Sequence, residues 1–567
     1  MSGTSFTVSS AASLDTAIYN VDTMSQNGTV GAYTIDIAGD ITLTNDLYGV
    51  VVGTGSSLTI IGNGYTIDGG GTYEGLLAYQ GNLSVEGLTI ADAHALGGPG
   101  GSGGGGGGGG AGLGGGLFVA SGAAVTLAGV DFVSDAATGG AGGTVDVGYA
   151  GGGGGGLGGA GGAGEIGTST TAVAGGGGGV GIAALGGGKG TAAGPGIVPV
   201  QDEFRNFHTG GGGGASSGFG GNGGLNYLSL AGFVTFGGGD GGAAGTNNPG
   251  SAGFGGGSPA GPGGDGGFGG GGGGGSSSTH GLAGFGAGRG GDSGANKGGG
   301  GGLGAGGDIF VQQGGTLVIA AGSLAAGTVT GGAGKSGGTS GTAYGSGIFI
   351  QGTDDLTLAP GAGQTLTIGG VIADMAGSGG TATALGALVI DGAGTVDLTV
   401  KNTFAGGITL GGGALVLGGT GAAGAGTITF AYDPSLEFTV ANTPTNVVAD
   451  FFPGATIDVL GFSATSSAYV SNVLTLTGSG GPVKLDIPGK ALSNFVVTDA
   501  IINGTSVAVV TSSPTVVVTA STDVELNADI LQADTLSQGT SVDYTINLTG
   551  NVTLTSDLAG ESHLEFA

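Results

Sequence analysis

Residues 111–140, AGLGGGLFVASGAAVTLAGVDFVSDAATGG, carry the pattern that decides the fold. The pattern returns at residues 302–334 as GLGAGGDIFVQQGGTLVIAAGSLAAGTVTGGAG, and in shorter form at residues 346–357 as SGIFIQGTDDLT. In each copy a turn of small residues leads into an apolar triplet, and an alternating strand follows a polar turn. Alternation with a period of two places every second side chain on one face, so each copy predicts short strands joined by corners. The triplets are Leu117–Val119, Ile309–Val311 and Ile348–Ile350.

Three further stretches share one layout, and they extend the repeat toward the N-terminus. They are SLTIIGNGYTIDG from Ser57, NLSVEGLTIADA from Asn82 and AVTLAGVDFVSDA from Ala124. In each, a pair of apolar residues precedes a glycine corner and a second apolar pair follows it. Units that cannot bury their own apolar face must stack on their neighbours, which is the logic of a solenoid. The sequence therefore predicts an all-β fold, a right-handed parallel β-helix, with a short helix at Leu14, Ile18 and Val21 that caps its first coil.

A long glycine-rich tract interrupts this column. Residues 97–308 contain 96 glycines among 212 residues. Ordering glycine costs more backbone entropy than ordering any other residue, and the tract has few large side chains to offset that cost. Two outcomes are open: the tract is mobile, or its runs pack side by side as polyproline-II-like rods that hydrogen-bond to one another. In the second outcome, recurrent aromatic residues form a thin apolar lid, namely Phe219, Phe254, Phe268 and Phe285.

The chain divides into five predicted regions. Residues 1–96 form the N-terminal cap and first β-helix coils, and residues 97–308 form the glycine-rich insertion, which includes one coil at 111–140. Residues 309–429 continue the β-helix. Residues 430–510 contain less glycine and more proline, which predicts a separate C-terminal β-module. Residues 511–567 are a linker followed by the start of a second copy of the N-terminal repeat.

The evidence for that second copy is a match between residues 526–558 and the start of the chain. Gln538 lies 512 residues after Gln26, and Tyr544 lies 511 residues after Tyr33, so the offset holds with one deletion. Two interpretations are open. The partial copy stacks on the cap of the next molecule and extends a head-to-tail filament, or it begins the next unit of a longer tandem array.

Composition narrows the classes of function. The net charge is −30, with only eight Lys and Arg, which disfavours a nucleic-acid partner. The absence of cysteine excludes disulfides, thiolate catalysis and cysteine-based zinc sites. No apolar run approaches the ~18 residues of a membrane helix, and MSGTSFTVSSAASL lacks the pattern of a signal peptide. No calcium-loop motif is present, and the sequence predicts no metal or cofactor.

Candidate catalytic groups are few, and none is assigned a role. Six aspartates sit at predicted turns or strand ends, where aspartate commonly binds local backbone groups. A polar and aromatic island, residues 201–208, predicts an internal acid–arginine pairing that anchors a loop; a ligand contact is the alternative. Four histidines lie far apart without the spacing of a zinc site. The aspartates are Asp68, Asp92, Asp131, Asp135, Asp354 and Asp355, and the histidines are His94, His208, His280 and His563.

Residues 392–417, GAGTVDLTVKNTFAGGITLGGGALVL, closely resemble the autotransporter-associated β-strand repeat. The matching positions begin with Gly394 and Thr395 and end with Leu415 and Leu417. Between them lie Asn402, Thr403, Phe404, Gly406, Gly407, Thr409, Gly412 and Gly413. The resemblance implies a β-helical exported passenger or adhesin at a bacterial cell surface or outer membrane. The chain departs from that family in showing neither a leader nor a C-terminal membrane barrel.

We therefore expect a non-enzymatic extracellular structural protein or adhesin that displays glycine-rich loops for surface attachment, matrix or fibre formation. Its expected partners are copies of itself or cell-surface and matrix glycans. The alternative is a carbohydrate-active β-helix protein, such as a polysaccharide lyase or a phage-type tail fibre, because such proteins use paired acids.

Overall fold

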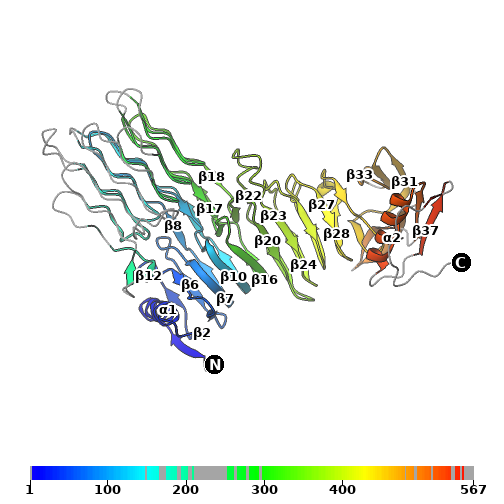
Figure 1. The fold of residues 1–567 in the computed structure, drawn as a ribbon, viewed down its shortest axis with the longest axis horizontal. Helices are drawn as coiled ribbons and strands as arrows, with labels where there is room; N and C mark the ends of the chain where they lie inside the picture. Colours follow the sequence, from blue (N-terminus) through cyan, green and yellow to red (C-terminus); the bar gives the residue numbers. More distant parts are fainter. Residues whose placement is uncertain are drawn as a thin grey trace. The chain divides into compact units, whose positions relative to one another are not determined.

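A computed structural model describes residues 3–146, 150–164, 174–187, 193, 195–201, 207–209, 252–260, 265–275, 280–292, 297–478, 480–490, 495–502, 504–512, 515–537, 543–549 and 552–553. The protein is all-β, with 39% of residues in strands and 6% in helices, and its main element is a large, mostly parallel sheet. Two compact units divide the chain (Figure 1). Unit 1 comprises residues 1–357, 366–387 and 402–405, and unit 2 comprises residues 358–365, 388–401 and 406–567.

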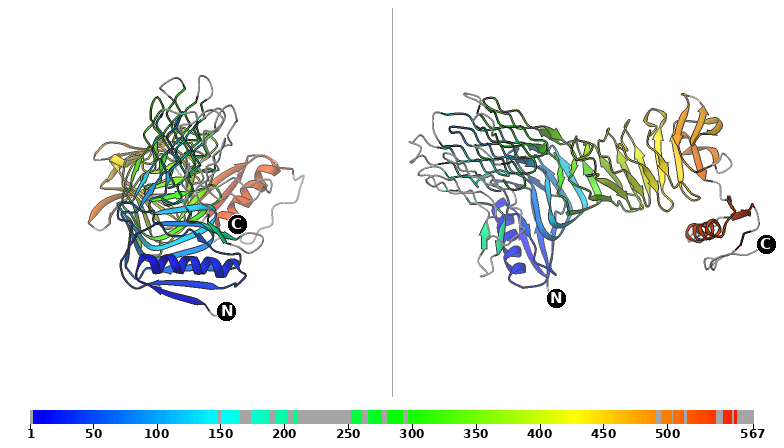
Figure 2. Two further views of the ribbon diagram at one scale, coloured as in Figure 1. Left: turned by 90° about the vertical axis from the view of Figure 1, so that its left-hand side faces the viewer. Right: turned by 45° about the horizontal axis from the view of Figure 1, so that its top comes forward.

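Unit 1 opens with a strand–helix–strand element made of β1 (Thr4–Val8), α1 (Ala11–Gln26) and β2 (Ala32–Ile37). The side chain of Ser10 accepts a hydrogen bond from the Ser13 N–H, and the side chain of Ser13 accepts one from the Ser10 N–H, so a capping box starts the helix. Leu14, Ile18 and Val21 are fully buried, which confirms the predicted apolar face. Figure 2 shows the helix lying against the first strands.

The stretches predicted to share one layout are paired in register. β5 (Ser57–Ile61) and β6 (Thr66–Asp68) both pair in parallel with one long strand, β7 (Leu76–Ala91), and β7 pairs with β10 (Leu117–Val133). Leu58 faces Leu83, and Leu83 faces Val125. Beyond the glycine corner, Ile67 faces Ile90, which faces Phe132. Two alternating ladders of buried aliphatic and aromatic side chains result, and they form the core of this region.

The apolar triplets also stack, although a long stretch of sequence separates the first two. β10 pairs with β15 (Ile309–Val311), which pairs with β19 (Ile348–Ile350) and then β22 (Ile372–Asp374). β10 also pairs with β16 (Thr316–Leu324). The column therefore resumes at β15 and β16 after the glycine-rich tract, as the matching copies predict.

The other strands before β23 are short. They are β3 (Ile41–Thr42), β4 (Val50–Val51), β8 (His94–Leu96), β9 (Gly112–Leu113), β11 (Ala136–Thr138), β12 (Pro199–Gln201), β13 (Phe207–Thr209), β14 (Gly304–Ala305), β17 (Thr328–Thr330), β18 (Ala343–Tyr344), β20 (Asp355–Leu358) and β21 (Thr365–Ile368).

The described glycine runs of unit 1 form a hydrogen-bonded array. We call the described parts of residues 97–110, 139–187, 252–302 and 331–341 the glycine array; they appear in Figure 1 as parallel traces beyond β8, β17 and β18. Donors recur at every third residue: the N–H groups of Gly98, Gly101 and Gly104 bond to the carbonyls of Gly156, Gly153 and Ala150 at 2.8–2.9 Å. A polyproline-II helix has three residues per turn, so this spacing is that of polyproline-II rods.

In one rod, residues 106–112, all three faces of the helix donate backbone hydrogen bonds to neighbouring runs. Within residues 106–112, every N–H donates to a neighbouring run, and the acceptor run changes with a period of three. The donor–acceptor pairs are Gly106–Lys297, Gly109–Gly300 and Gly112–Leu303 on one face, Gly107–Gly101 and Gly110–Gly98 on the second, and Gly108–Ser258 and Ala111–Gly255 on the third. The packing requires glycine: a Cβ on Gly98 would lie 1.9 Å from the Gly159 carbonyl oxygen.

Two columns of aromatic rings join the glycine array to the strands. Phe118, Phe310 and Phe349 stack along β10, β15 and β19 with centroids 5.1 and 5.5 Å apart. Phe254, Phe268 and Phe285 stack at 5.1 and 5.3 Å on the glycine-rich side. Phe254 meets Phe310 at 6.1 Å with tilted planes, so the columns interlock. The predicted aromatic lid therefore lies between the array and the strands; Phe219 is outside the described residues.

Unit 2 begins with parallel strands, continues with antiparallel ones and ends with a parallel strand–helix–strand element. β23 (Ala387–Ile390) pairs with β25 (Ile408–Leu410), and then with β27 (Ile428–Phe430) and β29 (Val448–Ala449). A second series runs through β24 (Thr395–Leu398), β26 (Ala414–Leu417), β28 (Ser435–Thr439) and β30 (Thr456–Leu460). A 3-10 helix, Val440–Asn442, follows β28.

The antiparallel part starts at β30, which pairs with β35 (Thr505–Ser512), and β35 pairs with β34 (Phe495–Ile502). β31 (Ala464–Val470), β32 (Val473–Gly478) and β33 (Val483–Asp486) form a separate antiparallel sheet. The last described elements are β36 (Thr515–Ala520), α2 (Asp523–Ser537) and β37 (Asp543–Leu548), with β36 and β37 parallel. Their order repeats that of β1, α1 and β2.

Candidate functional site

Most of the candidate aspartates bind local groups. Asp68 accepts a hydrogen bond from the Gly70 N–H, Asp354 from the Gly314 N–H and Asp131 from the Ser323 hydroxyl. Asp355 begins β20. Asp68 ends β6, Asp131 lies in β10 and Asp354 lies just before β20, so these carboxylates are apart from one another, and each satisfies a donor close to it in space.

Asp92 and Asp135 are the candidates that the structure brings together. Asp135 is fully buried after β10, and its Oδ1 accepts the Ala93 N–H at 2.8 Å. Its Oδ2 has no hydrogen-bond partner among the described residues. Burial raises the pKa of Asp135 to about 8; the Ala93 N–H opposes this rise, and the charge of Asp92 adds to it.

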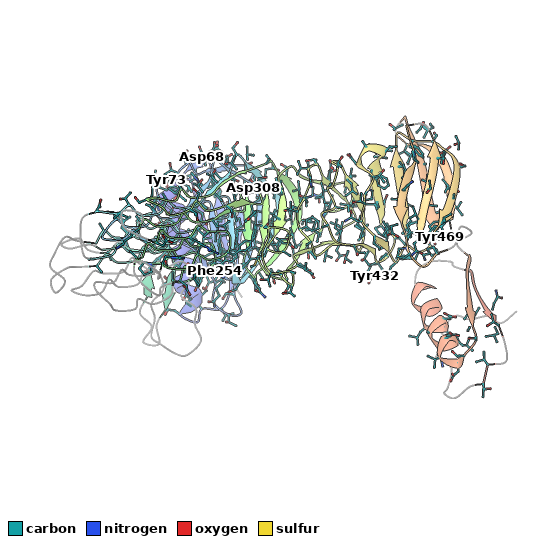
Figure 3. The ribbon with its side chains drawn as sticks, turned by 90° about the horizontal axis from the view of Figure 1, so that it is seen from above. Asp68, Tyr73, Phe254, Asp308, Tyr432 and Tyr469 are labelled. Atoms are coloured by element: carbon teal, nitrogen blue, oxygen red, sulfur yellow. The ribbon has the colours of Figure 1, made fainter. Side chains whose placement is uncertain are left out.

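A second buried carboxyl, Asp308, interacts with Asp135, and the sequence did not single it out. Burial, with the Asp135 charge as a further cause, raises the pKa of Asp308 to about 9. The Gly327 N–H lies close enough to lower that pKa, but neither carboxyl oxygen has a partner with hydrogen-bond geometry in the part of the chain that the structure describes. Figure 3 labels Asp308 within unit 1. A buried carboxyl without a counter-charge favours its protonated form.

The Asp135 and Asp308 side chains occupy space that is free because Gly116 and Gly327 have no Cβ. A Cβ on Gly116 would lie 2.7 Å from Asp135 Oδ2, and a Cβ on Gly327 would lie 2.5 Å from Asp308 Oδ1. Both N–H groups of Gly116 and Leu117 donate to the Asp308 carbonyl at 2.9 Å. The carboxyls are therefore held by close packing. Because neither side chain is exposed, the pair cannot reach a dissolved substrate.

Asp46 and Glu74 form another acid pair, and this one borders a cavity. Asp46 accepts the Ile182 N–H at 2.6 Å and the Glu74 N–H at 3.4 Å. Burial raises the pKa of Glu74 well above its usual range, with the Asp46 charge as a second cause. Glu74 lines a cavity of about 20 Å³, room for about one water molecule, whose other walls are mainly apolar. These walls include Leu77, Leu113, Phe118, Leu157 and Val180.

Sequence reasoning missed both acids of this pair. Asp46 lies in the Thr44-Asn45-Asp46 turn and Glu74 in a glycine-rich loop before β7, so each reads as an ordinary loop residue. An isolated acid immediately before a buried apolar run was the available signal. The pair combines a water-sized cavity with two acids whose pKa values burial raises, and acids of raised pKa recur at functional sites.

The polar island and the histidines do not form a site in the described residues. Residues 202–206 lie outside that part of the chain, and Gln201 and His208 belong to the antiparallel pair β12–β13. His94 bonds to the Gly71 carbonyl and the Thr138 hydroxyl. His563 is not described, and His280 has a buried Nδ1 without a partner among the described groups. No group of three or more His, Cys, Asp or Glu side chains suited to a metal occurs in the described ranges.

Membrane-spanning helices were sought in the same part of the chain. None of the helices described there has both the length and the apolar character needed to cross a bilayer. No family model matches the chain, and no curated protein matches it.

Proposed function

We propose that this chain is a non-enzymatic extracellular structural protein or adhesin, placed at a bacterial cell surface. In this proposal its strands form a right-handed parallel β-helix with a large glycine-rich insertion and a C-terminal β-module. The in-register pairing of β7 with β10 and of β10 with β16 supports the solenoid, since one strand segment stacks on the next with the same residues inward. The resemblance of residues 392–417 to the autotransporter-associated repeat supports the location.

The observation that carries the proposal is the glycine array. Its N–H and C=O groups bond to each other in three directions, and glycine occupies most of its closely packed positions. Catalysis needs acids, bases or nucleophiles, which glycine cannot supply. Such an array can hold a shape and present a surface, which is the work of a scaffold or an adhesin.

The expected partners follow from surface chemistry. A net charge of −30 repels nucleic acid and favours neutral or cationic surfaces and neutral glycans. Carbohydrate-binding surfaces need no deep pocket, and polar groups along strand faces are suited to them. Copies of the same chain are the other expected partner.

The proposal is tested with beads that carry the full chain. We expect saturable attachment to a subset of neutral glycans or to cell-wall material, measured on a glycan array and by bead counting under flow. Beads with Gly153→Ala, which places a Cβ 2.2 Å from the Gly176 carbonyl oxygen, are expected to lose attachment; Gly31→Ala is the matched control because a Cβ there meets nothing within 4 Å. Attachment that is absent from every surface, or unchanged by Gly153→Ala, contradicts the proposal.

A second candidate function is glycan depolymerisation, and the Asp46–Glu74 pair favours it. A carboxyl with a raised pKa beside a second acid is the equipment of a general acid. The test incubates the chain with neutral and acidic polysaccharides and measures new reducing ends. Activity that Glu74→Gln abolishes and Glu86→Gln preserves would replace the structural proposal; Glu86 is the control because it is an exposed acid on β7.

A further inference from the structure

The inference concerns the space that Asp135 and Asp308 fill in two adjacent layers of strands. Gly116 precedes β10 and Asp308 precedes β15, and these two strands pair in register. Asp135 precedes β11 and Gly327 precedes β17, which also pair in register. In one layer Asp135 therefore lies opposite Gly116, and in the next Asp308 lies opposite Gly327. The two carboxyls come from opposite sides, in layers about 4.8 Å apart.

Three oxygen atoms of these carboxyls have no hydrogen-bond partner in the described part of the chain. They are Asp135 Oδ2 and both carboxyl oxygens of Asp308. Both side chains are fully buried, and the donor that the described residues do supply is the Ala93 N–H, 2.8 Å from Asp135 Oδ1. Buried polar atoms are nearly always paired, so these three oxygens indicate a bound proton, water or ion.

Backbone carbonyl oxygens add to the oxygen atoms around Asp308. The point at which a Cβ on Gly327 would lie is 2.5 Å from Asp308 Oδ1, 2.7 Å from the Ser346 carbonyl oxygen and 2.9 Å from the Asp135 carbonyl oxygen. The Asp135 carbonyl also accepts the Thr328 N–H at 2.8 Å, which leaves its second lone pair for another contact. Oxygens from three segments of the chain thus converge beside a glycine that leaves room between them.

The chemistry of this oxygen set favours calcium. Carboxylate and carbonyl oxygens are the ligands that calcium takes, at about 2.3–2.6 Å, and one such ion spans two carboxyls in layers about 4.8 Å apart. No lysine or arginine among the described residues interacts with either carboxyl, so a divalent cation would balance both charges. Magnesium usually keeps several of its waters, for which a fully buried site offers little room.

We propose that Asp135 and Asp308 bind one calcium ion between these two layers of unit 1. Asp135 Oδ2 and the Asp308 carboxyl are its charged ligands, and the carbonyl oxygens of Ser346 and Asp135 are its neutral ligands. Only two of these ligands are acidic side chains, so the site differs from a cluster of three or more His, Cys, Asp or Glu, of which the described residues have none. The ion links segments that are 173 positions apart in the chain.

Burial determines how the ion enters and what it does. Because Asp135 and Asp308 are fully buried, the ion binds while the layers assemble and leaves only when they separate. Without it the carboxyls keep their protons, since an unpaired charge is costly in the interior. Calcium therefore stabilises unit 1 by binding its folded state. This inference goes beyond the proposed attachment function: metal content and unfolding test it, whereas binding to glycans tests attachment, so the two proposals fail separately.

The first experiment measures bound calcium. The full chain is purified in about 1 mM calcium chloride and desalted into about 150 mM salt, which screens weak binding to surface acids. Its metal content is then measured by mass spectrometry. We expect one retained calcium ion per chain in the parent protein and a loss of that ion in Asp308→Asn. Asp355→Asn is the matched control, because it removes the same charge from an exposed acid at the start of β20, and it is expected to retain the ion.

The second experiment compares thermal unfolding in calcium, in magnesium and in EDTA, followed by circular dichroism. Calcium at 100 times its Kd is expected to raise the Tm of the parent protein and of Asp355→Asn by about 3–5 °C over EDTA. Asp308→Asn is expected to show no calcium shift, and Asp135→Asn takes its place if that variant does not fold. A parent protein without retained calcium, equal calcium effects in the parent and Asp308→Asn, or equal stabilisation by magnesium overturns the proposal.

Discussion

Asp308 is buried beside Asp135, so that two carboxyl groups, with no counter-charge among the described residues, share the interior of unit 1. Gly116 belongs to both environments: its N–H donates to the Asp308 carbonyl, and its missing side chain leaves room for Asp135 Oδ2. Such a pair stays in the fold at neutral pH because the carboxyls keep their protons there. The pH dependence of stability follows from this.

The free energy of unfolding of unit 1 is expected to fall as pH rises. Asp135 and Asp308 have folded pKa values of about 8 and about 9, above the ordinary value of 3.8, so the folded state binds protons that the unfolded state has released. Each group then lowers stability by about 1.4 kcal/mol per pH unit, from about pH 4 up to its folded pKa. Urea unfolding at pH 5, 7 and 9 measures this. In Asp308→Asn the slope is expected to become shallower; equal slopes in this variant and in the parent protein contradict the assignment.

Replacement of Asp374 is expected to lower the free energy of unfolding, unlike replacement of Asp308, although both side chains are fully buried. Its oxygens accept the N–H groups of Gly377, Gly386 and Ala405 at 2.7–3.0 Å. Asp374→Ala leaves three buried donors without a partner, at about 1–3 kcal/mol each. Denaturant unfolding at pH 7 is expected to show a loss of about 3–5 kcal/mol, whereas Asp308→Asn stays within about 1 kcal/mol of the parent. A loss under about 1 kcal/mol for Asp374→Ala would show that these donors find other acceptors.

Single methyl groups are expected to disrupt the glycine array. A Cβ on Gly153 would lie 2.2 Å from the Gly176 carbonyl oxygen, too close for either rod to remain in place. Overpacking of this kind costs about 1–3 kcal/mol, and more where backbone atoms collide. Hydrogen exchange of the array amides is expected to accelerate in Gly153→Ala and to stay unchanged in Gly31→Ala. Unchanged protection in both variants would show that the rods can shift to admit a side chain.

The aromatic columns are expected to couple the glycine array to the strands. Phe310 is fully buried and stacks with Phe118 and Phe349. Phe310→Ala is expected to lower stability by about 3–5 kcal/mol. Phe254→Ala, on the array side, is expected to speed proteolysis of the glycine-rich segments before that of the strands. Tyr432→Ala is the control, because its ring is 75% exposed in unit 2; simultaneous loss of array and strands in Phe254→Ala would show a single cooperative unit.

The sequence predicted the paired register of the strands because alternation and turn glycines are local signals. Leu58, Leu83 and Val125 lie in matched stretches, and the structure pairs them. The pairing of Leu117 with Ile309 could be predicted across the long insertion, because the sequences on its two sides, residues 111–140 and 302–334, match. The resemblance at residues 392–417 remains untested, since no family model matches the chain.

The candidate sites were less accessible to sequence reasoning. Asp135 was singled out, but its partner Asp308 was not, because the two lie 173 positions apart and only the pairing of β10 with β15 brings them together. Asp46 and Glu74 were missed for a related reason. In the sequence each is an ordinary loop acid. Only the fold brings the Ile182 N–H of the glycine-rich tract within hydrogen-bonding distance of Asp46.

Sequence alone determined the parallel strand pattern, the capping helix and the second copy of the cap, because each rests on residue spacing within a short segment. Whether the glycine runs are ordered was decided only by the tertiary structure. A glycine run has no side-chain pattern to read, and its order depends on backbone hydrogen bonds to other runs. The same holds for the buried acids, whose pKa values depend on neighbours that only the folded chain supplies.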